Sequence, residues 1–76
     1  MAKEADWEGK ASRFVKAELK RADLTYDDLA KRLKKHGLEE TEASVANKLK
    51  RGTFAAAWFL AVLAALELEG VRLEDL

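Results

Sequence analysis

The sequence contains no cysteine and no proline, and it has a single histidine, His36. Without cysteine there is no disulfide framework and no thiolate metal ligand, and a single histidine cannot form a histidine cluster. The absence of proline leaves every segment free to continue as a helix. We therefore expect a helical chain with no metal and no cofactor.

The motifs of common catalytic sites are also missing. There is no glycine-rich phosphate loop and no metal-ligand spacing. His36 stands beside Gly37 at a predicted helix end, where a histidine commonly serves the helix dipole. Asp27 and Asp28 fit a helix cap better than an acid/base pair. We predict that the protein is not an enzyme, and no small-molecule ligand is evident.

Long hydrophobic runs are scarce. The longest, Phe54–Leu66, is too short to span a bilayer, and the segment MAKEADWEGK lacks the apolar core of a signal peptide. With 37% charged and 49% hydrophobic residues in a chain of 76, the composition disfavours disorder and suits one compact domain, residues 1–76. We expect a soluble, cytoplasmic protein without a membrane partner.

Neither sign of charge predominates, since the formal net charge is zero. The charges nevertheless alternate in short blocks, acidic at predicted helix starts and basic towards helix ends. Helix dipoles favour that order, so it needs no binding partner to explain most of it. Between residues 10 and 51, basic residues still outnumber acidic ones.

What the sequence does contain is helical periodicity, with apolar residues at three- and four-residue steps in four segments. Thr25, followed by Asp28 three residues on, forms a capping-box pattern. Gly37 and Gly52 suit the left-handed position that ends a helix. The other predicted N-caps are Asp6, Thr41 and Thr53.

The predicted fold class is all-α, a bundle of four to five helices. The helices are expected near residues 7–22, 26–36, 42–51 and 54–68, and the tail 70–76 can add a short fifth element. The residues expected in the core are Trp7, Phe14, Leu19, Leu29, Leu33, Val45, Leu49, Phe54 and Leu63.

The segment SVANKLKRGTF, residues 44–54, carries the most informative polar pattern. Val45 and Leu49 share one side of the predicted 42–51 helix, which leaves Asn47, Lys48 and Arg51 for the outer side. These residue types read base edges or hold phosphates in DNA. A basic surface helix alone is more often merely solvated. The place of this one, after a capped helix and before Arg51-Gly52, favours DNA binding.

LTYDDLAKRL followed by SVANKLKRG resembles the lambda-repressor-like (Cro-type) helix-turn-helix family. In that family a Thr or Ser caps the second helix, a Leu-Ala pair packs it, and the third helix closes on Arg-Gly. The chain is most similar to a group of small bacterial proteins of unknown function with a W…TY..L…N…RG.F pattern and an apolar last helix. Between Ala30 and Ser44 it is several residues longer than the usual repressor pattern, which implies a lengthened second helix or turn.

The resemblance implies a small bacterial transcriptional regulator that binds double-stranded DNA, with residues 42–51 as recognition helix. Tyr26 either reaches phosphate through its hydroxyl or belongs to the core. Glu42 repels phosphate unless it accepts a hydrogen bond from cytosine. The implied contact residues are Ser44, Asn47 and Lys48 for bases, and Thr25, Tyr26, Lys50 and Arg51 for phosphates.

The alternative function is a protein-interaction module or adaptor without DNA binding. The 54–68 helix is apolar nearly all round, so it is either central to a core or covered by a second molecule. Trp58, Phe59 and Leu60 are consecutive, and positions about 100° apart cannot all face one core. We predict a twofold homodimer through the last helix and the tail. Its interface residues would be Trp58, Phe59, Val62, Leu66, Val71 and Leu73.

Overall fold

The structure, a computed structural model, describes residues 6–76. These residues form four α-helices and one short 3-10 helix, and they contain no strand, so the all-helical prediction is confirmed. Residues 1–5, which the single-domain prediction includes, lie outside the described residues. The elements in chain order are α1 (Trp7–Ala22), α2 (Tyr26–Lys35), α3 (Glu42–Arg51), α4 (Ala56–Ala65) and η1 (Leu73–Asp75).

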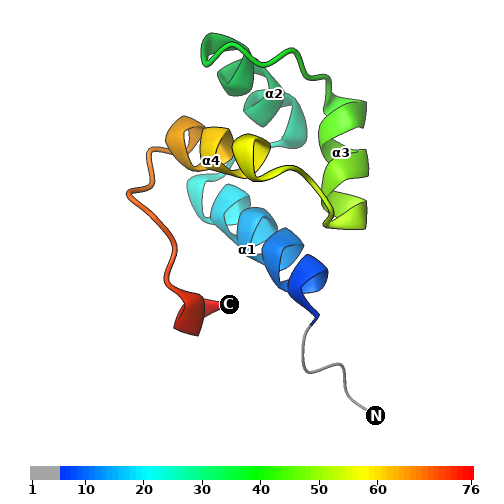
Figure 1. Ribbon diagram of the computed structural model, residues 1–76. Coiled ribbons are helices and arrows are strands. Elements are labelled where there is room, and N and C mark those ends of the chain that lie inside the picture. Colours follow the sequence, from blue (N-terminus) through cyan, green and yellow to red (C-terminus); the bar gives the residue numbers. More distant parts are fainter. Residues whose placement is uncertain (1–5) are drawn as a thin grey trace.

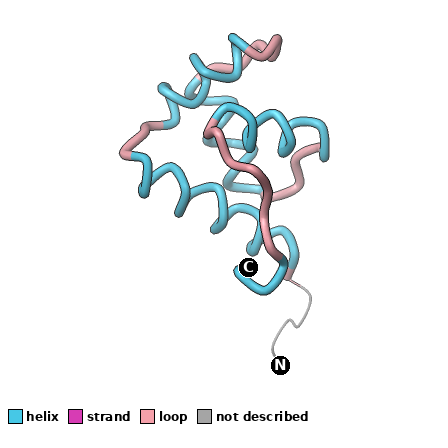
Figure 2. The backbone as a smooth tube through the Cα atoms, turned by 90° about the vertical axis from the view of Figure 1, so that its left-hand side faces the viewer, coloured by secondary structure: helices cyan, strands magenta, loops and turns pink. Residues whose placement is uncertain are grey.

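The helices pack around α2 and α3. Helix α3 contacts both α1 and α2, and α4 contacts α2. In Figure 1, α4 runs between α1 and α2, while α3 stands to one side of them. The rings of Phe14 on α1 and Phe59 on α4 lie 6.1 Å apart and join those two helices. Figure 2 shows the same helices from the side, joined by short loops.

The predicted helix ends are mostly confirmed. Asp6 accepts a hydrogen bond from the Gly9 N–H at the start of α1, and Thr25 and Asp28 form the predicted capping box. Thr41 caps α3, and Gly37 and Gly52 have φ angles of 89° and 74°. A glycine adopts this left-handed backbone without the steric cost of a Cβ.

Helix α4 is shorter than the predicted 54–68. Ala55 rather than Thr53 is its N-cap, and no side chain accepts a hydrogen bond there. The helix starts late because the ring of Phe54, which precedes it, packs against the rings of Trp58 and Phe59. The distances between ring centroids are 4.8 Å to Trp58 and 5.9 Å to Phe59. The end is early because Glu67 has a φ angle of 60°, which turns the chain out of the helix.

Helix α2 ends at Lys35. The residues that make this chain longer than the usual repressor pattern therefore lie in the turn between α2 and α3, residues 36–41. The Leu38 N–H donates to the Leu33 carbonyl, 3.0 Å away, which folds the start of the turn back on α2. The end of the turn is held by Glu40, described below.

The core is centred on six fully buried side chains from all four helices: Val15, Leu29, Leu33, Val45, Leu49 and Val62. The predicted core residues Leu19 and Leu63 are also buried, whereas Phe14 and Phe54 are half-buried at its edge. Trp7 was wrongly placed in the core. It is the first residue of α1, 53% exposed, and the Lys10 ammonium lies 4.7 Å from its ring centre.

Trp58 and Val62 were wrongly assigned to a dimer interface. They are 5% and 0% exposed, because the side of α4 that carries them faces the chain's own core. The periodicity of the sequence did not separate the sides of this helix, since nearly every position is apolar. Val15, Ala30 and Ala65 also belong to the core.

Candidate DNA interface on helix α3

Helix α3 is fixed on its inner side and at its end. Val45 and Leu49 are buried. The buried hydroxyl of Ser12 on α1 donates to the carbonyl of Leu49, one of the last carbonyls of α3. Gly52 lies so close to the backbone of Glu8 that an added Cβ would overlap it. The end of α3 is therefore clamped to the start of α1.

The outer side of α3 is polar and basic. At about 100° per residue, Asn47 lies opposite the side that carries Val45 and Leu49. Ala43, Asn47, Lys50 and Arg51 are all exposed. The structure thus places Asn47, Lys50 and Arg51 on one accessible surface, as the periodicity predicted for Asn47 and Arg51.

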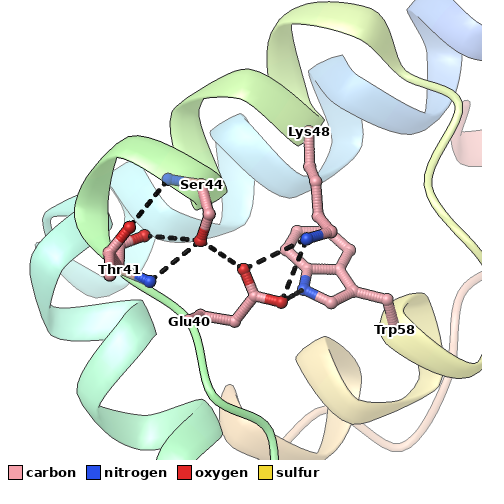
Figure 3. Close-up of polar contacts among 5 residues, drawn as sticks. All are labelled: Glu40, Thr41, Ser44, Lys48 and Trp58. Atoms are coloured by element: carbon pink, nitrogen blue, oxygen red, sulfur yellow. Dashed lines mark hydrogen bonds and ion pairs between the residues drawn. The ribbon is translucent and has the colours of Figure 1, made fainter.

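Ser44 and Lys48, two of the three predicted base readers, turn towards Glu40 instead. The Ser44 hydroxyl donates to Glu40 Oε1 at 2.5 Å, and its Oγ accepts from the Thr41 N–H at 2.8 Å. The Lys48 ammonium lies 3.1 Å from Glu40 Oε2. Figure 3 shows the carboxylate of Glu40 between Ser44 on one side and Lys48 and Trp58 on the other.

A hollow of about 390 Å³ runs beside this face, between α3 and the start of α4. It gathers four predicted contact residues with Thr53, which the sequence had suggested only as a cap. The first N–H groups of α4 receive no side-chain cap, so the positive end of that helix adds to the basic character of this region. The lining residues are Ser44, Asn47, Lys48, Arg51, Thr53, Phe54 and Ala55.

The start of α2 is poorly suited to the phosphate contact predicted for it. The Thr25 N–H donates to Asp28 Oδ2 at 2.9 Å, and Thr25 Oγ1 accepts from the Asp28 N–H at 3.0 Å. The hydrogen bond from the Thr25 backbone, and then that with its side chain, lower the pKa of Asp28. Desolvation opposes them, and the charges of Lys31 and Arg32 lower the pKa further. The Thr25 N–H is therefore engaged with the Asp28 carboxylate, and the Thr25 hydroxyl oxygen with the Asp28 backbone N–H.

Tyr26 is half-buried and packs against the core, so the structure favours the packing role of the two that its position allowed. Its side chain also borders a cavity of about 480 Å³. Lys16 and Lys20 of α1 line this cavity together with Glu42 of α3. The sequence analysis did not connect these two lysines with the start of the predicted recognition helix.

Glu40 was missed as a member of the site. It precedes the cap residue Thr41, and Ser44 and Lys48 follow it at steps of four. That spacing is the signal that could have found it, because residues four apart share one side of a helix. Trp58 could not have been added from spacing, since it comes from α4.

The remaining predicted interface residues lie around a second, apolar surface. Phe59, Leu66 and Val71 are half-buried and Leu73 is 70% exposed. Phe59, Val71 and Leu73 border a groove of about 380 Å³. We call this the Trp7 groove; its lining is Trp7, Glu8, Ala11, Gly52, Phe54, Ala56, Phe59, Val71, Leu73 and Leu76.

Residues 6–76 contain no candidate metal site and no helix that could span a membrane. His, Asp and Glu side chains do not gather there in a group of three that could hold a metal ion. Every helix of this part of the chain is too short or too polar to cross a bilayer.

A family described as "Domain of unknown function (DUF6471)" matches residues 7–71, from the first residue of α1 to the tail before η1. The chain belongs to this family. The DUF6471 match includes all four α-helices and the whole outer side of α3. It agrees with the predicted likeness to a group of unknown function, while the Cro-type likeness stays a prediction. No curated protein and no solved structure matches the chain.

Proposed function

We propose that the protein binds double-stranded DNA through the outer side of α3, in the manner of a helix-turn-helix, and acts as a transcriptional regulator. One observation carries the proposal: Asn47, Lys50 and Arg51 are exposed together on a helix whose opposite side is locked in the core. A recognition helix needs this combination of a rigid mount and an accessible polar side.

The three side chains divide the work by their chemistry. The Asn47 amide, directly opposite the core, can form two hydrogen bonds with adenine in the major groove. Lys50 and Arg51 flank it and suit phosphate oxygens or guanine. Ala43, one turn earlier, offers a methyl group to thymine. Ser44 and Lys48 take a smaller part than the sequence suggested, because Glu40 already engages them.

The turn of residues 36–41 is longer than the turn of about three to four residues in a typical helix-turn-helix. The length does not free α3, because its N-terminal cap, its buried side and its last turn are each held by other elements. A longer turn between two packed helices is compatible with groove binding as long as the second helix stays rigid.

The test is binding of a labelled duplex by fluorescence anisotropy across a range of salt, after a preferred site has been selected from random DNA. With two to three phosphate contacts, the logarithm of the affinity should fall with the logarithm of salt concentration with a slope of about −2 to −3. Absence of binding to any duplex at low salt, where counterion release is most favourable, would reject the proposal.

Two variants separate base reading from phosphate binding. Asn47→Ala should lose about 1–3 kcal/mol on the selected site and little on random DNA. Arg51→Ala should weaken both equally and flatten the salt slope by about one. Arg72→Ala, which removes an exposed arginine from the tail, is the control and should change neither. Equal losses for Asn47→Ala on both duplexes would show that Asn47 reads no base.

A second candidate function, self-association into a homodimer, is favoured by the Trp7 groove. Trp7 and Leu73 project from its edge at 53% and 70% exposure. A protruding apolar side chain beside an apolar hollow suits a twofold interface, since each copy can fill the hollow of the other.

A further inference from the structure

Glu40 is an acidic residue buried in the middle of a basic surface. Its side chain is only 8% exposed, although it lies in the turn between α2 and α3. Carboxylates are seldom buried unless their oxygens are paired and hydrogen-bonded. Here every donor comes from α3 or α4, so the carboxylate joins the turn to both helices (Figure 3).

Both carboxylate oxygens are satisfied. Oε1 accepts from the Ser44 hydroxyl at 2.5 Å and lies 3.3 Å from the Lys48 ammonium. Oε2 accepts from Lys48 at 3.1 Å and from the Trp58 indole N–H at 3.1 Å. Across residues 6–76, every buried side-chain nitrogen or oxygen has a hydrogen-bond partner. The network is therefore complete without an added ligand.

Lys48 is held differently from its neighbour Lys50. Its side chain is 37% exposed, its ammonium is paired with Glu40, and the same ammonium lies 5.9 Å from the centre of the Trp58 ring. Lys50, two residues on, is exposed. Because the Glu40 side chain is 8% exposed, a DNA phosphate that drew the Lys48 ammonium away from it would leave a buried carboxylate without its cation.

We propose that Glu40 is the positioning residue of the DNA-binding surface: it fixes the register of α3 against α4 and withholds Lys48 from phosphate. The inference rests on the proposed DNA binding and corrects the part that the sequence gave to Lys48. Asn47, Lys50 and Arg51 are then the residues that contact DNA. Glu40 prevents Lys48 of α3 from adding to non-specific binding.

The charge on Glu40 is the quantity to change. Glu40→Gln keeps the size of the side chain, with an amide oxygen that can still accept from the Trp58 N–H and an NH2 group that can donate to Ser44 Oγ, but it releases the Lys48 ammonium. Lys48 can then reach phosphate, so the salt slope should steepen by about 0.9, the increment for one phosphate contact, and non-specific DNA should bind more tightly. The double variant Glu40→Gln/Lys48→Met has the net charge of the wild type and should return to the wild-type slope.

Glu39→Gln is the matched control. It removes the same charge from the neighbouring, exposed residue. It should leave the slope unchanged. A purely structural role for Glu40 predicts lower thermal stability with no change of slope. Equal slopes for the wild type and Glu40→Gln would overturn the proposal, and so would equal steepening in Glu39→Gln and Glu40→Gln.

Lysine labelling of the wild type gives a readout that does not depend on whether Glu40→Gln folds. An amine-reactive reagent, followed by mass spectrometry, should modify Lys48 more slowly than Lys50 in the free protein. Saturating duplex DNA should then slow Lys50 and leave Lys48 unchanged. Labelling of Lys48 as fast as Lys50, or a further slowing of Lys48 by DNA, would overturn the proposal.

The two proposals fail in different ways. If the wild type binds DNA and Lys48 proves to be a phosphate contact, the inference about Glu40 fails alone. If Glu40→Gln binds DNA and the wild type does not, the inference is supported and the proposed function of the wild type fails. If neither protein binds any duplex, both are rejected.

Discussion

At the scale of single residues, several of the acids that make this chain neutral have local partners. Asp6 and Asp28 cap helices, Asp27 and Glu18 pair with a lysine and an arginine on their own helices, and Glu40 holds Lys48. A net charge of zero therefore does not describe the outer side of α3. There the exposed cations are not balanced by an acid on the same side of the helix, since Glu42 lies at its start.

Asp28 leads to a prediction about pH. Because Thr25 lowers its pKa in the folded chain, the ionised carboxylate stabilises the fold above the unfolded-state pKa. That stabilisation is lost as the pH falls through the lower, folded-state pKa. Asp28→Asn should be less stable than the wild type at neutral pH, and the difference should vanish between about pH 5 and about pH 2.

Urea unfolding across that pH range measures the difference. Asp27→Asn is the control, because Asp27 is in the same turn but outside the capping box and pairs with Lys31 on the surface. If the free energies of unfolding of Asp28→Asn and the wild type differ by the same amount at all pH values, the charge of Asp28 does not contribute to stability.

At the scale of elements, the sequence predicted helices well where local signals mark the ends. Helices α1 and α3 have the predicted bounds, 7–22 and 42–51, because a polar cap stands at one end and an abrupt change of pattern or a glycine at the other. Helix α4 has no such marks. Its cap is an alanine and its residues are apolar throughout, so neither its start nor its buried side could be read from the pattern.

The candidate site likewise contains residues that the sequence predicted and contacts that it could not predict. Periodicity predicted Asn47, Lys48 and Arg51 on the outer side of α3, because Val45 and Leu49 mark its inner side. Period could not show that Lys48 is engaged, since its partner Glu40 lies in a turn and the third member of the network, Trp58, comes from α4. Such contacts depend on how the helices pack against one another, so the pattern within a single helix cannot predict them.

Gly52 and Gly37 allow a test of how α3 is anchored. Both have a positive φ, so an alanine at either position carries a backbone cost of about 1–2 kcal/mol. A Cβ at Gly37 meets nothing within 4 Å, whereas at Gly52 it overlaps the backbone of Glu8. We expect Gly37→Ala to lose about 1–2 kcal/mol and Gly52→Ala clearly more.

Urea midpoints of the two variants, compared with the wild type, decide between backbone strain and contact. Gly52→Ala should also weaken DNA binding, since α3 must shift away from α1, and Gly37→Ala should not. Equal destabilisation by the two alanines would show that the contact between Gly52 and α1 does not hold the helix.

At the scale of the whole molecule, more of the apolar surface of α4 is buried within the single chain than the composition suggested. Trp58, Val62 and Ala65 enter the core of the single chain. Two apolar regions are left outside. One is Leu60, which is 64% exposed on α4, and the other is the Trp7 groove with Leu73 at its edge. Leu60 does not line the groove, so the two regions can be tested separately.

The self-association proposed for the Trp7 groove predicts a homodimer whose contacts depend on Leu73 and not on Leu60. Sedimentation velocity at high micromolar concentration should show the dimer for the wild type. Leu73→Glu should give a monomer, because a carboxylate in an apolar interface is costly to desolvate. Leu60→Glu makes the same change at a similarly exposed residue and should leave the dimer intact. A monomeric wild type would reject self-association, and dissociation by Leu60→Glu alone would move the interface to the outer side of α4.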